Sequence, residues 1–140
     1  MSEKLRLHLE RRHAAVAAIT EREEELKTIF EPVLDSLIQE VPNDPLTGNP
    51  IFAVDQKLDH GRVVGYLISC EKRAGSIEID SGLKTFKVTN GPRIDGHPIT
   101  ALQLIKHHPI GLARIDSKTL GLHDRPLDQF ISEMLDELLP

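Results

Sequence analysis

Cysteine, tryptophan and aromatic side chains in general are scarce in this chain. It has one cysteine, Cys70, no tryptophan, and aromatic residues make up only 4% of its 140 residues. A single cysteine excludes an intrachain disulfide framework. So few rings leave little surface on which unpaired bases could stack, which disfavours a binder of single-stranded nucleic acid. Cys70 lies in an apolar segment, so we expect it to be buried and inert.

The chain also lacks a long apolar run and an excess of basic residues. No apolar run approaches membrane-spanning length, and the first residues are too highly charged for a signal peptide. The formal net charge is -5 and the pI is near 5.8, which makes nucleic acid an improbable partner. With 39% hydrophobic and 28% charged residues, the composition is that of a globular domain. We therefore expect a cytoplasmic protein that contacts no membrane and needs no cofactor.

Motifs for catalysis and for ligand binding are missing as well. The sequence contains no HExxH, no GxSxG and no glycine-rich phosphate loop. The acid-x-lysine pattern of metal-dependent nucleases occurs only as Asp55-Gln56-Lys57, and a short pattern of this kind usually reflects ordinary strand charges. Because catalytic groups can converge from distant positions, these absences do not exclude an enzyme.

The first forty residues do contain a long repeat. Its positions follow one another in alternating steps of four and three residues: Leu5, Leu9, Arg12, Val16, Ile19, Glu23, Leu26 and Phe30. This spacing predicts a helix with the seam of a coiled coil, and good helix formers lie between the seam positions. We expect Pro32 to kink the helix or to start a second segment that ends before Pro42.

The two polar seam positions suggest how two copies could pair. If two helices cross antiparallel about Ala17 and Ala18, the facing pairs are Leu5 with Phe30, Leu9 with Leu26, Arg12 with Glu23 and Val16 with Ile19. The opposite-charge match does not follow from the repeat itself, and it could define the register. Thirty helical residues span about 45 Å, whereas a compact chain of this length is about 35–40 Å across. Part of the helix should therefore project, or the whole helix lies on its own sheet; both alternatives remain open.

Alternating apolar and polar residues after residue 50 predict an antiparallel sheet of four or five strands. The expected strands are 51–54, 62–71, 76–80, 84–89 and 110–115. A tight turn at Gly82-Leu83 pairs the third strand with the fourth, so that the facing residues are Ile79 with Phe86, Ile77 with Val88 and Glu78 with Lys87.

Two further helices are predicted in the last third of the chain. Thr100 and Gln103 form a capping box that would open a short helix to about residue 107. Asp124 and Pro126 begin a C-terminal amphipathic helix, whose apolar face should cover the sheet. The predicted fold is α+β, with a helical arm at 1–41 and an α+β body at 42–140 in a single domain.

This order of elements resembles that of the secretion chaperones of bacterial type III systems. The resemblance concerns element order and the small, acidic, one-cysteine character, and no individual residue is carried over. The opening helix is longer than the family pattern expects. The resemblance implies a dimer that holds a partner polypeptide.

Three functional hypotheses follow. The leading one is a non-enzymatic homodimer of adaptor, chaperone or inhibitor type that binds another protein. An alternative is a small hydrolase or metal-binding enzyme, because four histidines gather in one third of the chain; they are His97, His107, His108 and His123. Their spacing matches no metal motif. A second alternative is a nucleic-acid regulator that uses the basic first turns, from Lys4 to Arg12.

Overall fold

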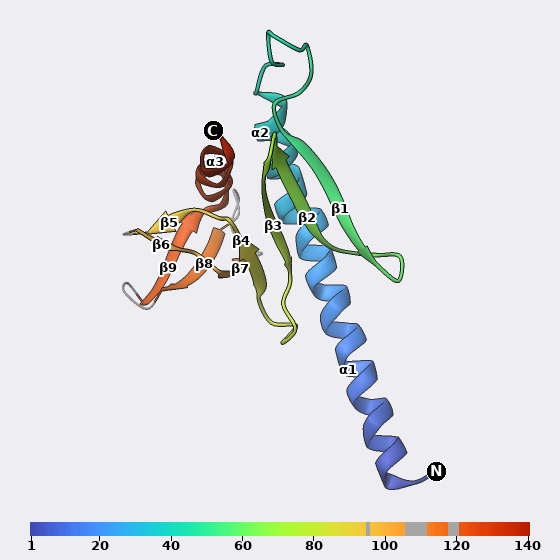
Figure 1. Ribbon diagram of the computed structural model, residues 1–140. Helices are drawn as coiled ribbons and strands as arrows, with labels where there is room; N and C mark the ends of the chain where they lie inside the picture. Colours follow the sequence, from blue (N-terminus) through green and yellow to red (C-terminus); the bar gives the residue numbers. More distant parts are fainter. Residues whose placement is uncertain (95, 106–111, 118–120) are drawn as a thin grey trace.

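The computed structural model describes residues 1–94, 96–105, 112–117 and 121–140. A helical rod forms the N-terminal part: α1 (Glu3–Glu25), a π-helical turn η1 (Leu26–Phe30) and α2 (Glu31–Gln39). The connector 40–52 leads to a series of strands, and α3 (Leu127–Leu138) follows them. The strands are β1 (Ala53–Asp59), β2 (Arg62–Cys70), β3 (Arg73–Ile79), β4 (Phe86–Thr89), β5 (Arg93–Ile94), β6 (His97–Pro98), β7 (Ala101–Ile105), β8 (Leu112–Ser117) and β9 (Gly121–Pro126). Figure 1 shows the rod running along the sheet, with the start of α1 extending past it.

The rod continues through Pro32, as the prediction of a second segment allowed. Pro32 lies in the first turn of α2, and the turn before it has π hydrogen bonding. Leu26, Phe30 and Leu34 follow one another at intervals of four residues, and all three are fully buried. A row with this interval drifts around an α-helix of 3.6 residues per turn. The wider π turn takes up the extra residue, so that the three side chains stay on the face that packs on the sheet.

The main sheet has seven strands in the order β1-β2-β3-β4-β7-β8-β9, and every neighbouring pair is antiparallel. The short hairpin β5-β6 lies outside this order. The α+β class is confirmed, while the sheet is larger than the four or five strands predicted. The predicted register between β3 and β4 is also confirmed: Ile79 pairs with Phe86 and Ile77 with Val88.

A bulge shapes the start of β2. The register with β1 shifts between Lys57 and Leu58, so that Val64 is an extra residue opposite them. An extra residue reverses the alternation of faces along a strand. This reversal lets Val63 and Tyr66 both point into the core, although they are three residues apart.

The prediction of a short helix at 100–107 is wrong. The segment Ala101–Ile105 is β7, with Leu102 and Leu104 buried and Gln103 exposed between them. Pairing with β4 and β8 on both sides satisfies the backbone of this segment, and this tertiary hydrogen bonding outweighs a local capping signal. The strand predicted at 51–54 begins later and runs over Ala53–Asp59. The strand predicted at 110–115 corresponds to β8, Leu112–Ser117, and its first two predicted residues lie outside the described residues.

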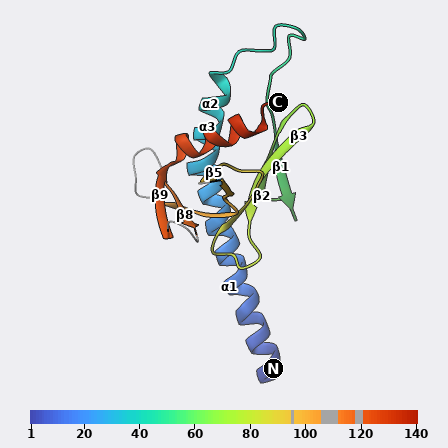
Figure 2. The ribbon, with the colours of Figure 1, turned by 60° about the vertical axis from the view of Figure 1, so that its left-hand side comes forward.

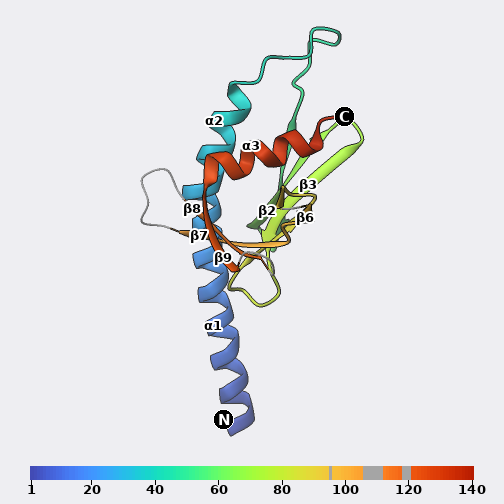
Figure 3. The same cartoon turned by 90° about the vertical axis from the view of Figure 1, so that its left-hand side faces the viewer.

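The C-terminal helix packs as predicted, but it begins at Leu127, and the predicted start at Asp124 lies in β9. α3 contacts α2, β3, β8 and β9 and crosses the rod at the level of α2, as Figures 2 and 3 show. Its buried residues are Leu127, Phe130, Ile131, Met134, Leu135 and Leu138. The core therefore lies between the sheet, α3 and the part of the rod that begins at Leu26.

Candidate functional site

The first five turns of α1 form a projecting arm, defined here as residues 3–19. Figure 1 shows this arm extending away from the sheet. Four of its large apolar side chains are exposed: Leu5 by 47%, Leu7 by 40%, Leu9 by 39% and Val16 by 50%. The buried hydrophobic core of the described residues contains no residue before Leu26. The arm therefore presents apolar surface that the described part of its own chain leaves exposed.

The rod docks on the sheet through polar contacts that begin at Thr20. The Arg62 guanidinium donates to Thr20 Oγ1 at 2.9 Å, and the Val63 backbone N–H donates to Glu23 Oε2 at 2.6 Å. Arg22 donates to the Lys84 carbonyl at 3.0 Å and forms an ion pair with Glu25 at 2.6 Å. These contacts attach one face of α1 to β2 and to the loop between β3 and β4.

Docking divides the predicted seam into two parts. Leu26 and Phe30 are fully buried in the core of their own chain, and Glu23 accepts a backbone hydrogen bond from β2. The sheet therefore already occupies the face on which Leu5 and Leu9 of a second copy were expected to lie. Leu5, Leu9, Arg12 and Val16 are exposed, and Ile19 is half-buried at the boundary.

Tyr66 joins the rod to β2 on the α2 side of the docking contacts. Its hydroxyl donates to Glu31 Oε2 at 2.5 Å, and its ring stacks on Phe30 with 5.5 Å between the ring centroids. Burial raises the pKa of Tyr66 far above its ordinary value of 10.0, and the neighbouring Glu31 carboxylate adds to this effect. The sequence carried no local signal for this pair, because its members are 35 residues apart.

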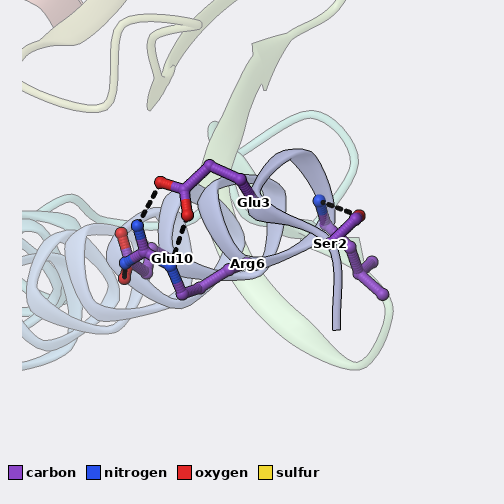
Figure 4. A network of polar contacts seen from close by, with 5 residues as sticks. Ser2, Glu3, Arg6 and Glu10 are labelled. Carbon is purple, nitrogen blue, oxygen red and sulfur yellow. Dashed lines mark hydrogen bonds and ion pairs between the residues drawn. The ribbon is translucent and has the colours of Figure 1, made fainter.

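The arm has its own charge network near its tip. Ser2 caps the helix by accepting the Leu5 backbone N–H at 3.1 Å, and Glu3 lies in the first turn (Figure 4). Arg6 pairs with both Glu3 and Glu10, with 2.8 Å to the latter. Arg6 is thus neutralised within the arm, whereas Lys4, Arg11 and Arg12 form no ion pair with any described residue.

Charge is distributed unevenly along the rod. Residues 3–13 contain the basic residues Lys4, Arg6, Arg11 and Arg12 and the acidic residues Glu3 and Glu10. Residues 21–40 contain the acidic residues Glu21, Glu23, Glu24, Glu25, Glu31, Asp35 and Glu40 and the basic residues Arg22 and Lys27. The two ends of the rod therefore have opposite net charge.

The structure does not bring the predicted histidines of the described segments into one site. His97 is exposed on β6, and His123 is half-buried on β9 opposite Ile115. His107 and His108 lie outside the described residues. Within the described segments no group of three His, Cys, Asp or Glu side chains is placed to hold a metal ion.

Asp124 and Glu78 form ordinary surface ion pairs. Asp124 accepts two hydrogen bonds from the Arg114 guanidinium, at 2.7 and 2.9 Å, and these bonds lower the pKa of its carboxyl group. Lys57 pairs with Glu78 across the sheet at 3.3 Å, and Asp55 is exposed on the edge strand β1. Cys70 is buried, as expected, with 3% of its surface exposed.

No family model, curated protein or solved structure matches this chain. No helix in the described part of the chain is both long and apolar enough to cross a membrane.

Proposed function

We propose that the protein is a non-enzymatic homodimer of adaptor, chaperone or inhibitor type, and that its two copies associate through the projecting arm. The observation that carries the proposal is the arm itself, a five-turn helix whose Leu5, Leu9 and Val16 are left exposed by the described residues of its own chain. Isolated helices of this length are marginal in water, and a partner that buries the apolar side chains would stabilise this one.

The charge of the rod favours a second copy as the partner, and it favours the antiparallel direction. In an antiparallel dimer the basic residues 3–13 of each copy lie beside the acidic residues 21–40 of the other. A parallel dimer would place like charges side by side, which is unfavourable. The rod therefore complements itself only when two copies run in opposite directions.

The docked half of the rod determines which face the second copy can use. Since Leu26 and Phe30 are covered by the sheet, the partner arm must lie on the solvent side of the rod, where Glu24 and Asp35 are exposed. This arrangement keeps the antiparallel direction that the repeat predicts and replaces part of its apolar contact with contact to acidic residues.

Sedimentation of exposed-leucine variants tests the proposal. We expect the wild-type chain to be a dimer at tens of micromolar, and we expect Leu5→Asp combined with Leu9→Asp to make it a monomer. Leu46→Asp is the matched control, because Leu46 is 93% exposed in the connector and lies outside the arm. This control should remain a dimer.

A wild-type monomer at tens of micromolar would contradict the proposal. So would a dimer that persists after both arm leucines are replaced. Circular dichroism of each variant separates loss of association from loss of folding, because none of the three substituted leucines belongs to the core.

A further inference from the structure

An apolar groove with an acidic rim lies between α2 and α3. One part has a volume of about 390 Å³, and its apolar lining is Leu37, Val41, Ile51, Phe52, Leu135 and Leu139. A second hollow of about 400 Å³ adjoins it and is lined by Pro32, Val33, Ser36, Leu37, Glu40 and Asp128. Leu37 and Glu40 belong to both, so that the two hollows form one surface.

We propose that this groove receives the first turns of the arm of a second copy. The inference rests on the antiparallel dimer proposed above and adds the place where each arm ends. The groove offers apolar side chains with acidic groups at its rim, namely Glu40, Asp128 and Asp136. The arm offers Leu5 and Leu9 beside basic groups, so that apolar and charged groups both find their complements.

The length of the arm agrees with this placement. From Lys4 to Glu21 the helix rises about 26 Å, at 1.5 Å per residue. The same distance along the rod from Glu21 reaches the end of α2, beside Leu37 and Glu40. Two arms that cross near Glu21 therefore end in each other's groove. The crossing lies one turn further along the rod than the repeat alone predicts.

The arm cannot fill the groove of its own chain. Lys4 and Glu40 lie at opposite ends of one nearly continuous rod, about 54 Å apart by its rise per residue. A twofold dimer lets both arms and both grooves be used at once, so that the assembly closes at two copies.

Disulfide trapping tests the placement. In the full chain, Lys4→Cys is combined with Glu40→Cys; both positions are exposed, and the native Cys70 is buried. Because residues 4 and 40 of one chain are too far apart, a bond between them can join only two copies. On mild oxidation we expect most of the protein to become a covalent dimer, and a reducing agent should reverse this. Peptide mapping should find the bond between residues 4 and 40.

A second pair of cysteines separates this inference from the proposed function. Lys4→Cys with Ala17→Cys would form a bond between copies if the arms overlapped only with each other. If the chain is a dimer but only this second pair is trapped, or neither is, the groove placement is wrong and the dimer stands. If the chain is a monomer, both are wrong.

Charge reversal at the rim gives a second measurement. Glu40→Lys with Asp136→Lys should weaken the dimer at least tenfold in dissociation constant. Asp55→Lys with Asp59→Lys is the control that makes the same change in net charge, because both are exposed acids on β1, away from the groove; it should leave the constant unchanged. Equal effects of the two changes would show a response to net charge only and would overturn the placement.

Discussion

Tyr66 is the residue whose contacts respond most clearly to pH. Replacing it with phenylalanine removes the hydrogen bond to Glu31 and leaves that carboxylate without its donor. We expect Tyr66→Phe to lower the free energy of unfolding by about 1–2 kcal/mol near pH 7, measured by urea denaturation.

The pH dependence of this effect has a definite sign. The folded chain keeps the Tyr66 hydroxyl protonated because its pKa is raised, whereas the unfolded chain loses the proton near the ordinary value of 10.0. Stability should therefore fall as the pH rises above about 10, and Tyr66→Phe should remove this part of the slope. Since Tyr66 is the only tyrosine and there is no tryptophan, the absorbance of tyrosinate reports its ionisation directly. A Tyr66 pKa near its ordinary value of 10.0 in the folded protein would contradict the buried hydrogen bond to Glu31.

Gly65 of β2 has no room for a side chain, because β3 lies too close to it. A Cβ there would lie 2.3 Å from the carbonyl oxygen of Ile77 and 2.8 Å from the Cα of Glu78. Gly65→Ala should therefore cost about 1–3 kcal/mol, because backbone atoms must move apart. Gly82→Ala is the matched control, since nothing lies within 4 Å of its Cβ position, and it should change stability by less than about 0.5 kcal/mol. Chemical denaturation of both variants measures the difference.

At the residue scale the sequence predicts burial better than it predicts polar partners. Cys70, Ile77 and Phe86 are buried as their patterns indicate. The roles of Glu23 and Glu31 could not be predicted, because each bonds to a strand 35 to 40 residues away. Only the fold brings such partners together.

At the element scale, the rod has two halves with different requirements. Leu26→Ala removes a fully buried side chain and should cost about 2–5 kcal/mol of stability. Leu9→Ala shortens a side chain that is 39% exposed, so it should lower the stability of the monomer far less. Its main effect should be on the dimerisation constant. Thermal melts at low and high protein concentration distinguish the two. Equal losses that do not depend on concentration would mean that the arm belongs to the core.

The elements also show where sequence patterns succeed. The β3-β4 register followed from alternation alone, because a shift by one residue would move Ile77 and Phe86 to the wet face. The segment 101–105 is a strand although Thr100 and Gln103 match a local capping pattern, and the buried Leu102 and Leu104 alternate with Gln103 as in a strand. The groove between α2 and α3 had no signal, since its lining comes from segments almost a hundred residues apart.

For the whole molecule, the proposed dimer should respond to salt. Its association brings exposed basic and acidic segments together, and such attractions are screened at high ionic strength. We expect the dissociation constant to rise about tenfold between about 0.05 M and 0.5 M salt, measured by sedimentation. If the contact between the copies were purely apolar, high salt would leave the dissociation constant unchanged or lower it. That result would count against the charge argument.

The fold of the whole chain was largely predictable, but the boundary between the projecting and the docked parts of the rod was not. The repeat in residues 5–30 correctly indicated a long helix, since exposed and buried apolar positions share one spacing. It could not distinguish Leu9, which faces solvent, from Leu26, which faces the sheet. That distinction depends on where the sheet ends, and no periodic pattern contains this information.

The end of the arm has a practical consequence for any purified preparation. Ser2 and Glu3 begin the helix, so that an affinity tag fused ahead of Met1 would extend from the tip that we place in the groove of the second copy. A tag fused after Pro140 would begin two residues beyond Leu139, which lines the same groove. Either tag would interfere sterically with the proposed contact between the copies. The association constant should therefore be measured on protein from which both tags have been removed.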